Sequence, residues 1–368
     1  MMTYSHRIKT IFSQLEEPVD VILLRNSSDP FIDPTFFYVT GIKKGLFEGC
    51  SILLRPDGSS HLLVSNLEEP LVPIGQKSTC FSSKKEYTDL LTELLTDCNT
   101  VGINTAMTLY DEYQHLQQLI PEKKLISISQ SVKNTRIIKD EEELHHIQEA
   151  CHIADQVMIK IPTFFSTPLT EHELAATIDH QLKQQGASSS AFETISSFGI
   201  NTAKPHYTSG NKKIQPGDFI ICDFGATVNH YHSDTTRTFV YGSASNKQKQ
   251  IHQTVLNAQQ QALNHIKPGV NANTIHQIAN DTINATEFKG YFIHSTGHSL
   301  GLNVHDSGIG FAPHYQTPLQ SGMVLTVEPG IYIPTIGGVR IEDDIVVSPD
   351  GYIQLTKSPK ELIEIPTK

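Results

Sequence analysis

Apolar and polar positions along the first 130 or so residues alternate between strand-like and helix-like patterns. The first short apolar runs along the chain lie at 20–26 and 35–41. They are followed by two strand-like runs within 50–65, joined by a Pro-Asp-Gly turn. Leucines at helical spacing then predict helices at 84–98 and 109–119, with short β-rich runs at 100–104 and 125–129 on either side of the second. This alternation predicts a small α/β domain.

The pattern changes near residues 130–138, where the composition becomes polar. One stripe of apolar residues at spacings of three and four then predicts a long helix that begins near Asp140: Leu144, Ile147, Cys151, Ala154, Met158 and Ile161. Beyond it the pattern predicts a helix at 170–185, strands at 192–199, 218–227 and 230–241, helices at 245–266 and 272–286, and further strands. We therefore expect two domains, 1–132 and 133–368, the second with an α+β layout.

The composition of the chain argues against several classes of protein. The 368 residues are 38% hydrophobic and 18% charged, which is typical of a soluble globular protein. No apolar run approaches the roughly 18 residues of a membrane span, and the start lacks a secretion signal, so we expect a cytoplasmic protein without a membrane partner. The net charge of -11 argues against nucleic acid. Five scattered cysteines without a CxxC motif indicate neither a disulfide framework nor a thiolate metal site.

Two carboxylates flank a predicted turn in the segment CDFGATVNHYHSDTTRT, residues 222–238. A two-residue turn at Val228 and Asn229 would place Asp223 directly opposite Asp234. Directly opposed residues have Cβ atoms about 4.5–5.5 Å apart, and like charges there are destabilising. A salt bridge or a solvated face would be the ordinary explanation, but Asp223 lies in the apolar run FIICDFGA, where an unpaired charge costs several kcal/mol. The pair therefore indicates a bound positive charge.

A second hairpin carries further acidic residues within 323–351, around a Pro/Gly-containing turn. Glu328 and Glu342 are equidistant from Thr335, so they would also lie opposite each other. Glu342 and Asp344 share one face of their strand, and Asp343 points away. If the two hairpins are neighbours in one sheet, Asp223, Asp234, Glu328 and Glu342 converge.

Histidines cluster between and before these hairpins. His294, His298 and His305 lie in the glycine-punctuated stretch YFIHSTGHSLGLNVHD, and His206 precedes the first hairpin. A single histidine is more often a surface or core residue than a ligand, but with three in so short a stretch a ligand role becomes about as probable as a structural one. Carboxylate oxygens with an imidazole suit manganese, cobalt, iron or zinc. Two such ions, about 3.5–4 Å apart, would cancel the repulsion between the carboxylates.

These segments, taken in order, resemble the pita-bread metallopeptidases, the family of methionine aminopeptidase, prolidase and Xaa-Pro aminopeptidase. The matching segments are D-F-G-A, S-D-x-T-R-T, H-x-x-x-G-H-x-x-G-L-x-V-H, V-E-P-G-I-Y and R-I-E-D-D, within 206–344. The resemblance implies five metal ligands, Asp223, Asp234, His298, Glu328 and Glu342, with Asp234 and Glu342 as bridges. It implies substrate or oxyanion contacts for His206 and His305, a position lining the site for His294, and an ordering role for Arg340. Ser299 stands where the family often has glycine.

The first half looks like the creatinase-type domain of prolidase and Xaa-Pro aminopeptidase, mainly through DPTFFYVTGI. The resemblance implies an exopeptidase for peptides with proline at the second position, with two divalent ions (manganese first, cobalt or zinc as alternatives), and a homodimer. Water bridging the two ions would attack the carbonyl, with Glu328 as general base. We expect an Xaa-Pro aminopeptidase, because no motif marks a clamp for a dipeptide's carboxylate. Prolidase, which accepts only dipeptides, is the alternative. Relatives that act on creatine without metal, or only bind partners, have broken ligand sets, whereas this set is intact.

Overall fold

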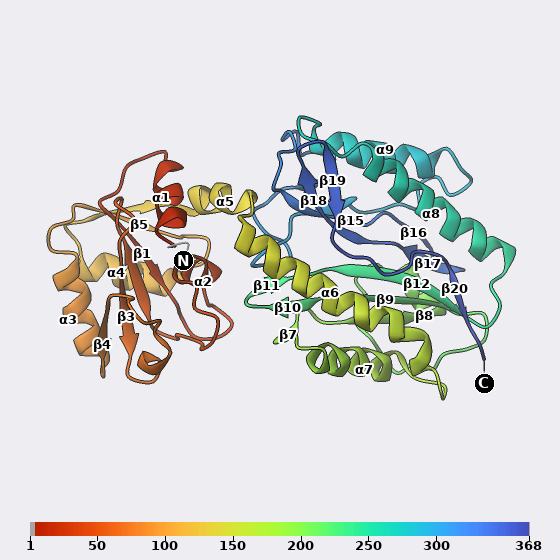
Figure 1. The fold of residues 1–368 in the computed structure, drawn as a ribbon, viewed down its shortest axis with the longest axis horizontal. Coiled ribbons are helices and arrows are strands. Elements are labelled where there is room, and N and C mark those ends of the chain that lie inside the picture. Colours follow the sequence, from red (N-terminus) through yellow and green to blue (C-terminus); the bar gives the residue numbers. More distant parts are fainter. Residues whose placement is uncertain (1–3, 368) are drawn as a thin grey trace. The chain divides into compact units, whose positions relative to one another are not determined.

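A computed structural model describes residues 4–367, and the chain divides into two compact units, Met1–Arg136 and Ile137–Lys368 (Figure 1). The N-terminal unit is built on a mixed sheet with strand order β4-β3-β2-β1-β5-β6. Its strands are β1 (Val21–Arg25), β2 (Ser51–Leu54), β3 (Ser60–Ser65), β4 (Ser78–Phe81), β5 (Thr100–Ile103) and β6 (Lys124–Ser127). Its helices are α1 (Ser5–Ser13), α2 (Pro34–Thr40), η1 (Glu69–Leu71), α3 (Lys84–Leu94) and α4 (Tyr110–Leu119), and α5 (Ser129–Ile137) spans the division.

Both faces of β1 are buried, as expected of a strand inside an α/β layer. Val21 and Leu23 pack with residues of α3 and α4, including Leu91 and Leu116. Ile22 and Leu24, which point to the other face, are also buried. The predicted hairpin within 50–65 is present, with β2 antiparallel to β3.

The segment 35–41 is helical, although its aromatic and β-branched residues suit strands. The Asp33 side chain accepts the Thr35 N–H at 2.8 Å, and Pro34 occupies the first helical position. Gly41 then ends α2 in the left-handed conformation, with φ 66°. Local capping signals therefore outweigh strand propensity here.

The C-terminal unit contains four longer helices within its described residues, each close to its predicted position. They are α6 (Glu141–Phe164), α7 (Glu171–Gln184), α8 (Asn246–Asn264) and α9 (Ala272–Asn284), with a short helical turn η2 (Gly199–Ala203). Asp140 and Glu143 form a capping box at the start of α6, which fixes the point where this long helix begins.

The strands of this unit form small sheets in the orders β11-β10-β7, β20-β12-β9-β8, β13-β14, β15-β18-β19 and β16-β17. Their bounds are β7 (Ser189–Ser190), β8 (Ile195–Phe198), β9 (Phe219–Phe224), β10 (Ala226–Val228), β11 (Tyr231–His232), β12 (Thr235–Tyr241), β13 (Gly297–His298), β14 (Gly310–Phe311), β15 (Val324–Val327), β16 (Gly330–Ile333), β17 (Gly337–Arg340), β18 (Asp343–Ser348), β19 (Gly351–Gln354) and β20 (Ile363–Ile365).

The strands lie between two helix pairs, so that the C-terminal unit is layered (Figure 1). Ile220, Cys222 and Phe224 of β9 pack with α6 and α7 in one hydrophobic core. Residues of α8 and α9 pack with β15–β18 in another core. Because side chains alternate along a strand, Asp223 points away from the α6–α7 core and toward the second group of strands.

Within residues 4–367, no helix combines the length and the apolar character that a bilayer crossing requires.

Candidate metal centre

A single cavity of about 590 Å³ in the C-terminal unit is lined by every residue that the sequence pointed to. The structure brings together Asp223, Asp234, His298, Glu328, Glu342, His206, His294, His305 and Arg340. Asp223 lies in β9 and His298 in β13, whereas Asp234, Glu328 and Glu342 occupy the breaks between consecutive strands. Side chains at strand breaks are released from the regular up-and-down alternation, so several can turn into one cavity.

The register predicted for the first hairpin is wrong by two residues, because the turn lies one residue further along the chain than predicted. Asp223 is paired with Thr236 rather than with Asp234. The turn is formed by Asn229 and His230, whose φ angles of 48° and 71° are those of a type I′ turn, and not by Val228 and Asn229. Asp234 is then a diagonal neighbour of Asp223, and both carboxylates still line the cavity.

The second hairpin has the predicted register. Val327 pairs with Asp343 and Gly330 with Arg340, which sets Glu328 opposite Glu342. Asp343 points away from the cavity, as predicted, and its carboxylate contacts two cationic side chains. It receives hydrogen bonds from Arg237 Nη2 at 2.7 Å and from Lys360 Nζ. Burial alone would raise the pKa of Asp343, but Arg237 and Lys360 hold it below its usual value.

Among the carboxylates that face the cavity, Asp223 is paired with Arg340, whereas Asp234, Glu328 and Glu342 have no such ion pair with a lysine or arginine among the described residues. Burial, followed by repulsion from Glu342 and Asp223, raises the pKa of Asp234 well above its usual value. Burial and the nearby Glu328 and Asp223 do the same to the pKa of Glu342, and burial raises the pKa of Glu328. With all four groups ionised, the cluster requires positive charge beyond that of Arg340.

The donor atoms fit a divalent metal. Ligand atoms of Asp234, His298 and Glu342 all lie within 4.8 Å of one another. His298 Nε2 lies 3.5 Å from Asp234 Oδ2 and 3.6 Å from Glu328 Oε1. Ligands about 2.0–2.2 Å from a tetrahedral ion are separated by roughly 3.4 Å, so these spacings suit a shared ion. Among the described residues, the buried atoms Asp223 Oδ1 and Asp234 Oδ1 have no hydrogen-bond partner, which leaves them available as ligands.

A set of hydrogen bonds orients these carboxylates. Thr236 Oγ1 donates to Glu342 Oε2 at 2.6 Å, and the Asp234 N–H donates to Asp344 Oδ2 at 2.8 Å. The Cys151 thiol of α6 donates to the same Asp344 oxygen at 3.3 Å. Such contacts fix the direction of a ligand's lone pairs before a metal binds. Asp344 therefore supports the cavity from behind rather than lining it.

Arg340 connects three of the groups around the cavity. Its guanidinium donates to the Asp223 carboxylate, to Tyr332 Oη at 2.8 Å and to Thr236 Oγ1 at 3.1 Å. Because the guanidinium is planar and rigid, these bonds fix all three partners together. This arrangement supports an ordering role for Arg340.

The histidine rings at the cavity differ in their hydrogen bonds and in their pKa. The His294 ring lies 2.7 Å from the Ser295 carbonyl through Nδ1 and 2.8 Å from Tyr332 Oη through Nε2, so both nitrogens are engaged. Burial, then Arg340, lowers its pKa to about 3. His305 packs edge-on to His298 with ring centroids 4.1 Å apart. Partial burial, then His298, lowers the pKa of His305 to about 4, so this imidazole is neutral near pH 7.

The loop that carries His206 is held by a buried carboxylate that sequence reasoning missed. Glu171, at the start of α7, accepts hydrogen bonds from the Phe198 N–H at 2.8 Å and from Tyr207 Oη at 2.9 Å. Asn201 Nδ2 and the Gly210 N–H also donate to it, at 2.9 and 3.2 Å. Four donors thus hold the segment on both sides of His206.

Other residues of the site were missed as well. Tyr332 and Thr236 lie inside the motifs V-E-P-G-I-Y and S-D-x-T-R-T, so the motifs themselves could have pointed to them. His314 and Tyr315 line the cavity but belong to no motif, and their rings are tilted toward each other with centroids 4.1 Å apart. No sequence signal singles them out.

Comparison with known proteins agrees with this geometry. Residues 145–349 match the family model described as Metallopeptidase family M24, and residues 13–138 match the model described as Creatinase/Prolidase N-terminal domain. The chain is 37% identical over 315 residues to a Xaa-Pro dipeptidase of Pyrococcus furiosus, an alignment that covers 86% of this chain and 89% of the relative.

Two solved structures are similar over almost the whole chain. The Xaa-Pro dipeptidase from Bacillus anthracis has a TM-score of 0.88 and 33% identity, covering 98% of this chain and 99% of that one. The X-Pro aminopeptidase from Thermotoga maritima has a TM-score of 0.88 and 28% identity, covering 94% and 97%. The predicted family and fold are confirmed. The chain is a metallopeptidase of family M24, in the branch whose pita-bread catalytic domain follows a creatinase/prolidase N-terminal domain.

Proposed function

We propose that this protein is an Xaa-Pro dipeptidase that uses two divalent metal ions. The convergence of four carboxylates and His298 on one cavity carries the proposal, because this donor set suits a pair of hard divalent cations. Relatives at 37% and 34% identity, from Pyrococcus furiosus and Pyrococcus horikoshii, are both named Xaa-Pro dipeptidase. They favour the dipeptidase over the aminopeptidase that the motifs led us to expect.

Asp223, Asp234, His298, Glu328 and Glu342 would hold the ions, with Asp234 and Glu342 shared between them. When bound, the ions would supply the charge that offsets the carboxylates and would activate a water molecule for attack on the peptide carbonyl. Manganese is our first choice because carboxylate-rich sites suit it, with cobalt or zinc as alternatives.

The chain's own groups would carry the proton and the developing charge. Glu328 would accept the water's proton, and a pKa raised by burial brings this carboxylate nearer to the operating pH of a general base. His305, whose lowered pKa keeps it neutral, would offer an N–H to the oxyanion, together with His206. Arg340 and Tyr332 would hold Asp223 and His294 in place.

The cavity also suits the proposed substrate. Apolar side chains along its wall, including Phe192, Ile195 and Ile309, offer a surface for the proline ring. The imidazole of His314 borders the same cavity and suits the carboxylate that ends a dipeptide. The acidic cluster would favour the free amino group at the other end.

One assay tests the proposal. Metal-stripped protein is reconstituted with manganese, cobalt or zinc and offered Ala-Pro, Ala-Pro-Ala and Ala-Ala. We expect metal-dependent cleavage of Ala-Pro with little cleavage of the other two. Comparable cleavage of Ala-Pro-Ala would instead identify an Xaa-Pro aminopeptidase, and binding without cleavage of any peptide would identify a binding protein. The homodimer suggested by the family resemblance is a separate proposal, which sedimentation analysis tests.

A further inference from the structure

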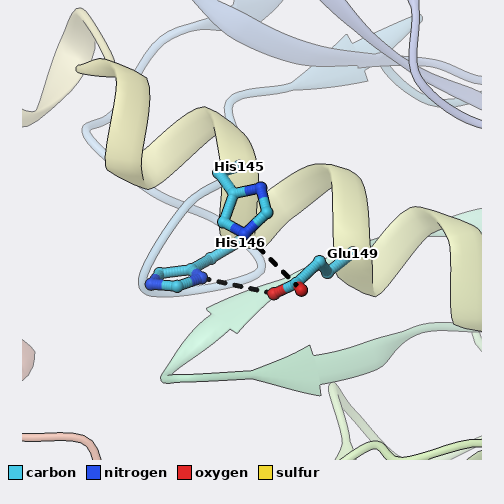
Figure 2. A group of neighbouring side chains, drawn as sticks. All are labelled: His145, His146 and Glu149. Atoms are coloured by element: carbon cyan, nitrogen blue, oxygen red, sulfur yellow. Dashed lines mark hydrogen bonds and ion pairs between the residues drawn. The ribbon is translucent and has the colours of Figure 1, made fainter.

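We propose that His145, His146 and Glu149 of α6 form a separate binding site for one transition-metal ion. The three side chains converge on the same side of the helix (Figure 2). Each contributes one ligand atom, and these atoms all lie within 4.8 Å of one another. None of the three lines the cavity of the metallopeptidase centre. The site and its test therefore do not depend on the function proposed above.

The spacing of the donor atoms suits a small ion. His145 Nε2 lies 3.5 Å from Glu149 Oε1, and His146 Nδ1 lies 3.4 Å from Glu149 Oε2. Donors about 2.0–2.2 Å from a tetrahedral ion are separated by roughly 3.4 Å. Each imidazole nitrogen already has this spacing to one of the two Glu149 oxygens. The helix supplies both of these contacts, since His145 and His146 lie four and three residues before Glu149.

The surroundings of His146 add a further polar group. Asn229 Nδ2 lies 3.3 Å from the same His146 Nδ1 that faces Glu149. One ring nitrogen cannot both accept from that amide and donate to the carboxylate. A metal bound to Nδ1 removes this conflict, because a turned amide can then present its oxygen to the ion. Glu142 Oε1, 4.0 Å from His146 Nε2, lies on the other side of the ring.

The site would join two elements that precede a ligand of the metallopeptidase centre. Asn229 belongs to the type I′ turn between β10 and β11, and α6 lies against both strands. The His146 ring also packs on Tyr231 of β11, with centroids 5.7 Å apart. The chain continues from β11 directly to Asp234. An ion at this position would therefore fasten the start of α6 to the hairpin that leads into the centre.

The ligand chemistry differs from that of the centre. Two imidazoles with one carboxylate favour zinc, nickel or copper, whereas four carboxylates with one imidazole favour manganese. We take zinc as the ion, because its tetrahedral geometry agrees with the donor spacing. The exposed side chains of His145 and Glu149, at 64% and 47%, leave the site open to ions in solution.

Zinc binding by the whole protein tests the proposal. Metal-stripped wild type and the variants His145→Ala and Glu149→Gln are dialysed against buffered free zinc, and bound zinc per chain is measured by mass spectrometry. Both substituted side chains are exposed, so the variants should fold normally, which circular dichroism verifies. The matched control is His152→Ala, an exposed histidine further along the same helix and outside the cluster.

We expect each variant to lose one zinc ion per chain, or to bind that ion at least about tenfold more weakly, since even outer-shell substitutions cost that much. His152→Ala should bind zinc as the wild type does. A zinc-edge anomalous peak between the three side chains would support the same conclusion. Identical binding curves for the wild type and both variants would overturn the proposal, as would an equal loss of zinc in His152→Ala.

Discussion

The guanidinium of Arg340 and the carboxylate of Asp223 form an ion pair inside the C-terminal unit, where the two residues are only 3% and 7% exposed. Arg340 ends β17 and Asp223 lies in β9, so the pair joins the two hairpins that carry the acidic cluster. An arginine beside a carboxylate-rich cavity supplies one fixed positive charge, and the remaining carboxylates still need others.

Replacing Arg340 by lysine should lower kcat by about tenfold or more while the protein stays folded. Lysine keeps the charge but cannot reach Asp223, Tyr332 and Thr236 together as the planar guanidinium does. Steady-state kinetics on Ala-Pro, with thermal unfolding as the check on folding, measures the effect. Wild-type kcat in Arg340→Lys would show that charge alone matters at this position.

Asp234→Ala should abolish activity and weaken the binding of at least one metal ion. The side chain contributes to the donor cluster with His298 and Glu342, and its Oδ1 atom has no hydrogen-bond partner among the described residues. Calorimetric titration with manganese and an Ala-Pro assay give the two readouts. Full activity in this variant would refute the proposed sharing of Asp234 between two ions.

Glu171→Gln should lower kcat/KM by about tenfold, because a glutamine cannot accept from all four donors that hold the loop around His206. A buried donor left without its acceptor costs about 1–3 kcal/mol, enough to shift the loop. Glu173→Gln, on the same helical turn but outside this network, is the matched control. In a His206→Ala background the Glu171 effect should disappear. An equal loss in that background would mean that Glu171 acts on the fold and not through His206.

The contribution of Glu342 to the stability of metal-free protein should fall as the pH rises from about 5 to 8. The folded-state pKa of Glu342 lies above its unfolded value, so the native state keeps a proton that the unfolded chain releases. This contribution is fully present below the ordinary carboxylate pKa and is lost as the pH passes through the raised one.

Urea unfolding of metal-stripped wild type and Glu342→Gln, each at both ends of that range, isolates the effect. The wild type should lose more free energy of unfolding than the variant, because the histidine contributions are common to both proteins. Manganese should remove most of the difference. Parallel losses in the two proteins would count against repulsion among the carboxylates as its source.

The sequence reveals those parts of the centre that depend on local pattern. The register of the second hairpin follows from the symmetry of its turn, and the structure agrees. The first hairpin was misjudged because Asn229 can occupy either central position of a two-residue turn. The observed turn also requires His230, a residue with a Cβ atom, to adopt a positive φ of 71°. Tertiary contacts decide such a choice, and they are not visible in the segment itself.

Glu171 could not be found from sequence for a related reason. Its partners Phe198, Tyr207 and Gly210 lie about thirty residues or more along the chain, and a glutamate in the first turn of a helix is ordinary. His314 could not be identified as a site residue either, since one histidine among 18 gives no information until the fold brings it to the cavity. Position in space, rather than residue type, identifies both residues.

The neighbours Glu342 and Asp343 place carboxylates on opposite sides of one backbone. Asp343 is neutralised by Arg237 and Lys360, which the polypeptide supplies permanently. Glu342 faces a cavity whose balancing charge has to arrive by diffusion. The charge of Asp343 is therefore balanced as soon as the chain has folded, whereas the charge of Glu342 is balanced only when metal ions are available. Metal starvation would leave Glu342 without its balancing charge. It would not change the ion pairs of Asp343.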